Sequence, residues 1–160
     1  MRPEEIKTVI VTLGLLAESE GILAQLYREA GTATGDAAFW STLARQEDKH
    51  SASLKEMARM ITAANGAGFE VARRFPAGAV HSFMQYVVNN LAQVRNGSKR
   101  GIELYQLARS IEQAVLDQRY PDIVRTDDPA FNGLMEEIIN ETRQHLSSAE
   151  EKVKKLQAQP

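Results

Sequence analysis

The 160 residues, 43% apolar and 25% charged, have the composition of a single soluble domain spanning residues 1–160. Lys and Arg number 19 against 21 Asp and Glu, so no basic excess is available to bind nucleic acid. The absence of Cys excludes disulfides, thiolate metal sites and a cysteine nucleophile, which leaves His and carboxylates as metal ligands. The apolar run Thr8–Ala17 lacks the flanks of a signal peptide and the length of a membrane span, so we expect a cytoplasmic protein without membrane contact.

Two long helices are expected in the first half of the chain. The first covers Glu4–Ala30, because Pro3 and an acidic first turn favour a helix start and Gly31 favours an end. Asp36 is placed to cap the second helix. That helix carries a mostly apolar face made of Trp40, Leu43, Glu47, His50, Leu54, Met57 and Ile61. The short connection between the two predicts an antiparallel hairpin.

A long crossover is expected to follow. The segment Asn65–Gly78 is rich in Gly, Ala, Phe and Arg, which indicates a connection without a long helix. Val80–Val94 then has the periodicity of a shorter helix, and Asn96 and Gly97 end it.

Two further long helices complete the chain. One covers Ser98–Tyr120 and ends before Pro121, which has no backbone N–H to continue it. The other begins at Asp128, an N-cap followed by Pro129 at the first helical position, and runs through Val153. The fold class is therefore all-α.

Several polar residues fall on faces that are otherwise apolar, namely Glu20, Glu47, His50, Glu112 and His145. A buried, unpaired carboxylate costs several kcal/mol, so each inward Glu needs a cation or a proton. Glu47 and His50 are three positions apart on one helix, which lets both side chains reach the same ion. A weak repeat places His145 three positions after Thr142 in the second half.

The chain resembles the rubrerythrin branch of the ferritin-like superfamily over roughly Glu4 to Leu156, with the specific motifs before residue 51. The likeness rests on the run from Glu20 to Tyr27, on Phe39–Trp40 and on the run from Leu43 to His50. It implies a ferritin-like four-helix bundle, made of two antiparallel helical hairpins joined by a long crossover containing a short helix. It also implies Glu20 as a terminal metal ligand, Glu47 as a bridging ligand, His50 as a nearby ligand and Tyr27 as a phenol behind the ligands.

The second half departs from that family pattern. The resemblance implies Glu112 as a terminal carboxylate and His145 as the second imidazole. Thr142 stands where the family has the second bridging Glu, and Glu141 is the residue that could turn inward to replace it. A site for two ions, for one ion or for none therefore stays open.

Ordinary structural roles for the same residues also stay open. Glu47 and His50 could form a solvated ion pair, and His145 could be a core histidine bonded to Glu112 or Thr142. Along the chain Glu18 competes with Glu20, and Glu103 competes with Glu112. The seven-residue step from Glu20 to Tyr27 places those two on one helix face and favours Glu20.

The functional expectation follows from the resemblance. It implies a non-haem iron protein of di-iron type, with manganese or zinc as alternative metals, that reacts with peroxide or dioxygen or handles iron. Because this chain has no Cys for a rubredoxin-like domain, the electron donor would be a separate partner. The alternative is a metal-free or mononuclear bundle that acts as a structural or interaction module. The apolar segments Val9–Leu16 and Ser82–Val94 favour a homodimer.

Overall fold

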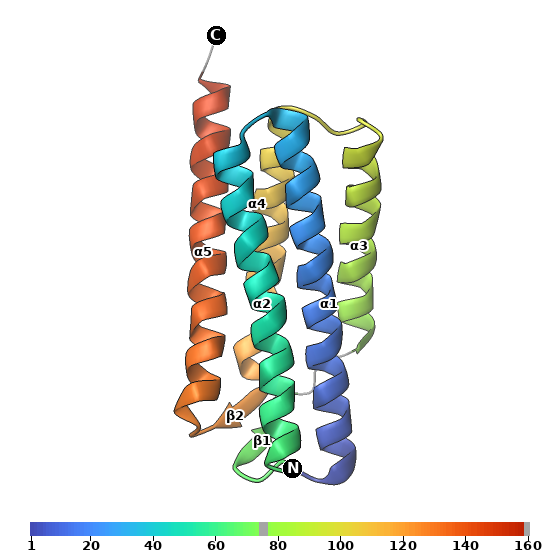
Figure 1. Cartoon of the computed structure of the whole chain (residues 1–160), viewed down its shortest axis with the longest axis vertical. Helices are drawn as coiled ribbons and strands as arrows, with labels where there is room; N and C mark the ends of the chain where they lie inside the picture. The colour runs from blue at the N-terminus through green and yellow to red at the C-terminus, as the bar shows by residue number, and fades with distance from the viewer. Residues whose placement is uncertain (74–76, 159–160) are drawn as a thin grey trace.

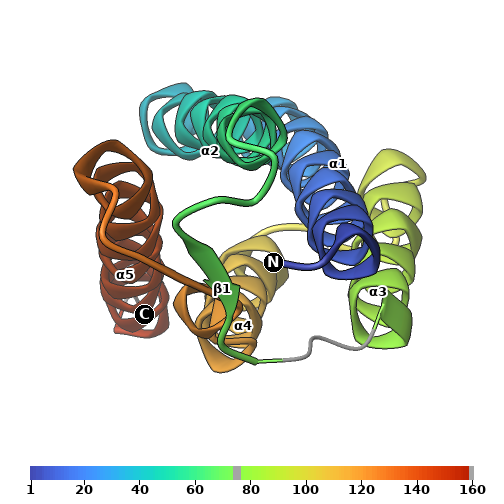
Figure 2. The ribbon, with the colours of Figure 1, turned by 90° about the horizontal axis from the view of Figure 1, so that it is seen from below.

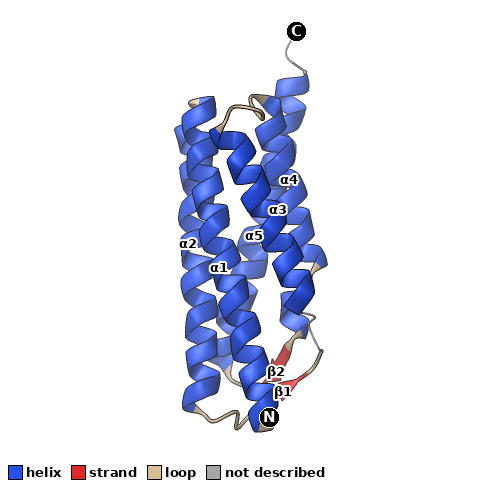
Figure 3. Cartoon of the chain, turned by 90° about the vertical axis from the view of Figure 1, so that its right-hand side faces the viewer, coloured by secondary structure: helices blue, strands red, loops and turns tan. Residues whose placement is uncertain are grey.

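The computed structural model describes residues 1–73 and 77–158, and it confirms the all-α class. Long helices run side by side along one axis, and a small two-stranded sheet lies near the N-terminal end of the bundle (Figures 1 and 3). The elements in chain order are α1 (Pro3–Thr34), α2 (Ala37–Ala63), β1 (Phe69–Val71), α3 (Ala77–Arg95), α4 (Ile102–Asp117), the 3₁₀ helix η1 (Tyr120–Asp122), β2 (Val124–Thr126) and α5 (Pro129–Gln157).

The first hairpin, α1 with α2, extends further than expected. The helix predicted to end at Ala30 continues to Thr34, and Gly35 ends it with φ 72°. Gly31 is inside the helix, where a Cβ atom would lie 3.1 Å from the Cβ of Trp40. Gly31 therefore allows α1 and α2 to pack closely, and it does not end α1. Asp36 caps α2 as predicted, accepting a hydrogen bond from the Phe39 N–H at 3.4 Å.

The second hairpin, α4 with α5, begins later than expected. The predicted helix Ser98–Tyr120 was too long at both ends, since α4 covers only Ile102–Asp117. Gly101 precedes it with φ 58°, and Arg119 follows it with φ 55°, and neither backbone conformation continues an α-helix. The start of α5 is as predicted, because Asp128 accepts hydrogen bonds from the N–H groups of the two residues after Pro129.

The crossover contains the expected short helix and an unexpected sheet. α3 packs against α1 and lies outside the interior that α1, α2, α4 and α5 surround (Figure 2). β1 and β2 pair antiparallel with Phe69 opposite Thr126, so two segments far apart in sequence close one end of the bundle. Residues 74–76 of the predicted connection Asn65–Gly78 lie outside the described residues.

α1 is long and apolar enough to meet a simple test for a membrane-spanning helix. Its most apolar 18-residue window has a mean hydropathy of 1.5, and 56% of that window is buried inside the molecule. The core helix of a soluble protein meets the same test, so this helix is weak support for a membrane span. Among the described residues, the large apolar side chains that remain exposed are Val11 on α1 and Tyr86 and Val88 on α3.

Candidate metal centre

Five polar side chains from four helices share the interior of the bundle. Glu20 comes from α1, Glu47 and His50 from α2, Glu112 from α4 and His145 from α5, and each is at most 2% exposed. They lie on the inward faces that their spacing predicted. The competing residues Glu18 and Glu103 are exposed, which leaves Glu20 and Glu112 as the interior carboxylates of their helices.

Glu47 belongs to two groups of converging ligand atoms. One group is Glu20, Glu47 and His50, and the other is Glu47, Glu112 and His145. Within each group, one atom from every residue lies within 4.8 Å of the others, which is the separation expected of ligands around one ion. The shared carboxylate places the two groups next to each other.

The two oxygens of Glu47 face different histidines. Its Oε2 is 2.8 Å from Nδ1 of His50, and its Oε1 is 2.9 Å from Nδ1 of His145. The same His145 nitrogen is 3.5 Å from Glu112 Oε1. Glu47 Oε1 and His145 Nδ1 form no hydrogen bond with any described residue, because their approach is not aligned for one. An ion near both atoms would satisfy them together.

The outer nitrogens of both histidines have polar partners on the α2–α5 side. Nε2 of His50 is 2.9 Å from Glu141 Oε2, and Nε2 of His145 is 2.9 Å from Gln46 Oε1. A carboxylate only accepts hydrogen bonds, so without a cation the Nδ1–H of His50 donates to Glu47 Oε2. An ion bound at Glu47 would take the place of the Nδ1 protons, and each histidine would then donate outward from Nε2. Second partners of this kind fix the ring orientation of metal-binding histidines.

Glu141 therefore takes a different position from the one considered for a bridging ligand. It is outside both groups of converging atoms and contacts the outer nitrogen of His50, while Lys49 binds its other oxygen at 3.1 Å. Sequence reasoning missed Gln46 altogether. Its position directly before Glu47 was visible, but which histidine it would reach depends on how α2 packs against α5.

Thr142 is buried and uses its hydroxyl within its own helix. Its hydroxyl donates to the Ile138 carbonyl of its own helix at 2.8 Å, so its hydrogen-bonding need is met locally. The second bridging carboxylate expected from the family pattern thus has no replacement among the described side chains at this position.

Glu20 and Glu112 differ in their surroundings. Both oxygens of Glu20 are buried without a hydrogen-bond partner among the described residues. Glu112 accepts a hydrogen bond from the hydroxyl of Tyr27, which is fully buried on α1. The phenol expected behind the ligands is therefore in contact with Glu112, one of the expected ligands.

The pKa values of the cluster show that it holds protons when no cation is present. Burial and the nearby Glu47 charge raise the pKa of Glu20 well above its usual value, and the same causes raise that of Glu112 to about 7. Burial also acts on Glu47, but the two histidines outweigh it and lower the pKa to about 2. For His145, the carboxylates outweigh burial and raise the pKa to about 10.

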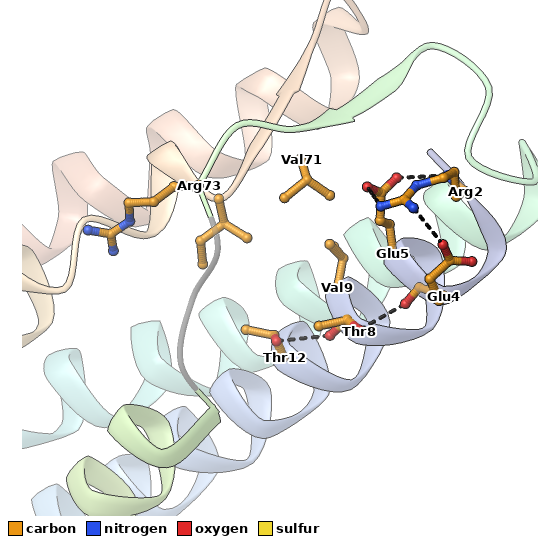
Figure 4. A pocket seen from close by; sticks show the side chains of 9 residues that line it. Arg2, Glu4, Glu5, Thr8, Val9, Thr12, Val71 and Arg73 are labelled. Carbon is orange, nitrogen blue, oxygen red and sulfur yellow. Dashed lines mark hydrogen bonds and ion pairs between the residues drawn. The ribbon is translucent and has the colours of Figure 1, made fainter.

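A cavity of about 320 Å³ lies elsewhere, between the start of α1 and β1 (Figure 4). Val9, Val71 and Ile123 form its apolar part. The charged groups at its rim pair with each other, since Arg2 binds both Glu4 and Glu5. None of the cluster residues lines it, so the polar interior of the bundle is the candidate site.

Comparisons of the chain with protein-family models, with curated proteins and with solved structures found no match. Any inference about function therefore rests on the residues of the site.

Proposed function

We propose that the protein is a ferritin-like four-helix bundle that binds non-haem iron at Glu47 and reduces hydrogen peroxide or dioxygen. The observation that carries this proposal is the sharing of Glu47 between two buried carboxylate–histidine groups. In this assignment α1 with α2 and α4 with α5 are the two hairpins, and the crossover containing α3 joins them. A bundle core lined by Glu and His from facing helices is a common place for such a metal site.

The residues present fit a metal ion. Three interior carboxylates are too many for a dry core unless cations or protons offset them. Both oxygens of Glu20 lack a hydrogen-bond partner among the described residues, and carboxylate oxygens are ligand atoms that metals accept. Nδ1 of His145 forms an ion pair with Glu47 Oε1, and a metal ion would take the place of its proton. Each group supplies three side chains, which leaves further positions on an ion open to a substrate.

The ligand types are compatible with a redox metal. Oxygen donors with one imidazole per group suit iron and manganese, while zinc would also be accepted. Ferrous iron, when bound, supplies the electrons that break an O–O bond. The chain itself holds the ligand atoms, keeps bulk water out of a buried site, and places the Tyr27 hydroxyl against Glu112, where it orients that carboxylate.

Thr142 decides how many ions bind tightly. A single shared carboxylate offsets the repulsion between two divalent ions less well than two would. We therefore expect one ion to bind strongly and the second weakly, a mononuclear site being the limiting case. The cluster can also exist without metal, because the low pKa of Glu47 and the raised pKa of His145 describe an ion pair that compensates itself.

Metal content is the direct test. Protein purified from cells supplied with iron and manganese is analysed by mass spectrometry beside Glu47→Gln, which keeps the side-chain size but removes the charge. Glu103→Gln is the matched control, because Glu103 is an exposed carboxylate. Iron retained in the control and lost in Glu47→Gln supports the proposal. Equal metal in all three samples, or none in any, contradicts it.

Peroxide consumption by the iron-loaded protein then tests the reaction. A separate electron donor, supplied as a chemical reductant in the assay, is expected to sustain repeated turnover. Oxidation of the iron without turnover would favour iron handling, and an absence of iron would favour a structural or interaction module.

A further inference from the structure

Three aromatic rings connect the candidate metal centre to one end of the bundle. Tyr27, whose hydroxyl is bonded to Glu112, has its ring centroid 5.6 Å from that of Trp40. Trp40 is in turn 4.9 Å from Tyr105, with the ring planes tilted by 35°. The rings come from α1, α2 and α4 in succession, so they form a continuous path across three helices.

At the outer end of this path, Tyr105 can pass its phenolic proton to a neighbouring carboxylate. The Tyr105 hydroxyl donates to Asp36 Oδ2 at 3.0 Å, and Lys152 Nζ is 2.6 Å from the same oxygen. The side chains of Asp36 and Lys152 are 24% and 36% exposed, so this end meets solvent. It lies where α1 connects to α2, at the end of the bundle opposite the small sheet (Figure 1). Trp40, in contrast, is fully buried.

Packing alone does not require these residue types. Phe39 also contacts Trp40 and Tyr105, with centroid distances of 4.8 and 5.2 Å, and completes the same aromatic cluster without a hydroxyl. Tyr27 and Tyr105 instead carry hydroxyls, and each donates to a carboxylate. Tyrosine and tryptophan are the side chains of this cluster that can lose one electron, and tyrosine does so most readily when an acceptor for its proton is in contact.

We propose that Tyr27, Trp40 and Tyr105 form an electron path that supplies the second electron of peroxide reduction when only one ferrous ion is bound. This rests on the proposed function. Reduction of hydrogen peroxide to two water molecules takes two electrons and two protons from solution. A ferrous ion held at Glu47 would supply one of these electrons. The other comes from Tyr105, which becomes a neutral tyrosyl radical.

The path balances at every residue. Tyr27 gives up an electron while its proton shifts to Glu112, and it recovers both when Trp40 donates the next electron. Trp40 is restored by an electron from Tyr105, whose phenolic proton moves to Asp36. A one-electron reductant of the enediol class, such as ascorbate, then reduces the Tyr105 radical from solvent, and Asp36 returns the proton. Position 142 carries Thr where the family has a bridging carboxylate, which favours a centre with one ion. A single ferrous ion would supply only one electron, so the second has to come from the tyrosine.

The path itself is tested in metal-free protein. Trp40 is the one tryptophan in the chain, so a laser flash that photoionises tryptophan produces a radical at a known position. We expect its absorbance to convert to that of a tyrosyl radical. Tyr27→Phe and Tyr105→Phe should each slow the conversion, and the double variant should abolish it. Tyr86→Phe is the matched control, since Tyr86 is a 42% exposed tyrosine on α3.

The proton acceptor is tested by Asp36→Asn. Asn also caps helices well, so α2 keeps its start while the acceptor for the Tyr105 proton is removed. Conversion to the tyrosyl radical should be slower in this variant. All the aromatic variants keep their rings, and thermal melting confirms that each one is folded.

The connection to peroxide is tested with one equivalent of iron per chain. After mixing with hydrogen peroxide and rapid freezing, electron paramagnetic resonance should show a tyrosyl radical. Tyr105→Phe should leave the radical at Tyr27 or Trp40 and so change the signal, and Tyr27→Phe should lower its yield. Unchanged conversion in the double variant overturns the path. Iron bound at the wild-type level without any radical also overturns it. If the chain binds no iron but the conversion is slower in each single variant and lost in the double variant, the path is supported and only the proposed function is overturned.

Discussion

Oε1 of Glu47 and Nδ1 of His145 face each other at 2.9 Å, yet neither atom forms a hydrogen bond with a described residue. The two side chains come from α2 and α5, and both are at most 2% exposed. A buried donor atom is rarely left unsatisfied in a folded protein. The two atoms form an ion pair when His145 is protonated, and a cation bound at Glu47 would take the place of that proton.

Metal removal should lower the melting temperature of the wild-type protein. A ligand at a hundredfold excess over its dissociation constant stabilises the native state by about 2.7 kcal/mol. For a domain of this size, that corresponds to a shift of roughly 5–10 °C between iron-loaded and chelator-treated samples. Thermal unfolding followed by circular dichroism measures it. Glu47→Gln should melt at the same temperature with and without chelator, and a shift that persists in this variant would contradict the assignment.

Thr142→Glu should raise the number of tightly bound iron ions per chain. A carboxylate at this buried position adds the missing bridge between the two ligand groups. Without metal the variant should be less stable than wild type by several kcal/mol, because a further charge is buried without a partner. Iron titration followed by metal analysis measures the stoichiometry. Gln has nearly the same size as Glu but carries no charge. The control variant Thr142→Gln should therefore be destabilised by overpacking without binding more iron.

Glu141→Gln should weaken metal binding without changing the number of ions at saturation. Glu141 contacts the outer nitrogen of His50 and lies outside the converging ligand atoms. Changing a partner of this kind typically costs about 10–100-fold in metal affinity. Competition with a chelator of known affinity measures the change. Glu137→Gln is the control, because Glu137 binds Lys49 on the same surface. A lower saturating stoichiometry would mean that Glu141 is itself a ligand.

Gly31→Ala should destabilise the protein despite the better helix propensity of Ala. The added methyl carbon would lie 3.1 Å from the Cβ of Trp40, and Trp40 is fully buried and cannot move freely. Overpacking of this kind costs about 1–3 kcal/mol. Gly14→Ala is the matched control on the same helix, where nothing lies within 4 Å of the new atom, and it should gain about 0.5–1 kcal/mol. Urea unfolding of both variants decides the prediction, which fails if the two are equally stable.

The free energy of unfolding should fall at acid pH because Asp36 becomes protonated. The hydrogen bond from Lys152 is the largest cause that lowers the pKa of Asp36, with smaller contributions from Tyr105 and the Phe39 N–H against partial burial. Since the folded pKa lies below the unfolded value, this stabilisation is complete above about pH 5 and is lost as the pH falls below about 4. Asp36→Asn should show a shallower decrease in the free energy of unfolding over that range. Identical slopes in urea unfolding would contradict this.

The sequence by itself determined the local features of the protein. Helical periodicity separated the inward Glu20 from the outward Glu18, because a helix turns by a constant angle per residue. The two caps, Asp36 and Asp128, were visible because an N-cap is a contact between neighbours in the chain. The predicted helix ends at Ala30, Ser98 and Tyr120 were wrong. Gly31 serves close packing inside α1, and the positive φ angles of Gly101 and Arg119 limit α4 to a shorter range.

Only the tertiary structure decided which of these features meet. The sharing of Glu47 between two groups depends on the angles and offsets of four helices, which no local pattern specifies. The same long-range packing placed Glu141 beside His50, paired β1 with β2, and stacked Trp40 between Tyr27 and Tyr105. The chain thus encodes its helices and their polar faces locally, and it acquires a candidate metal centre when helices distant in sequence bury those faces together.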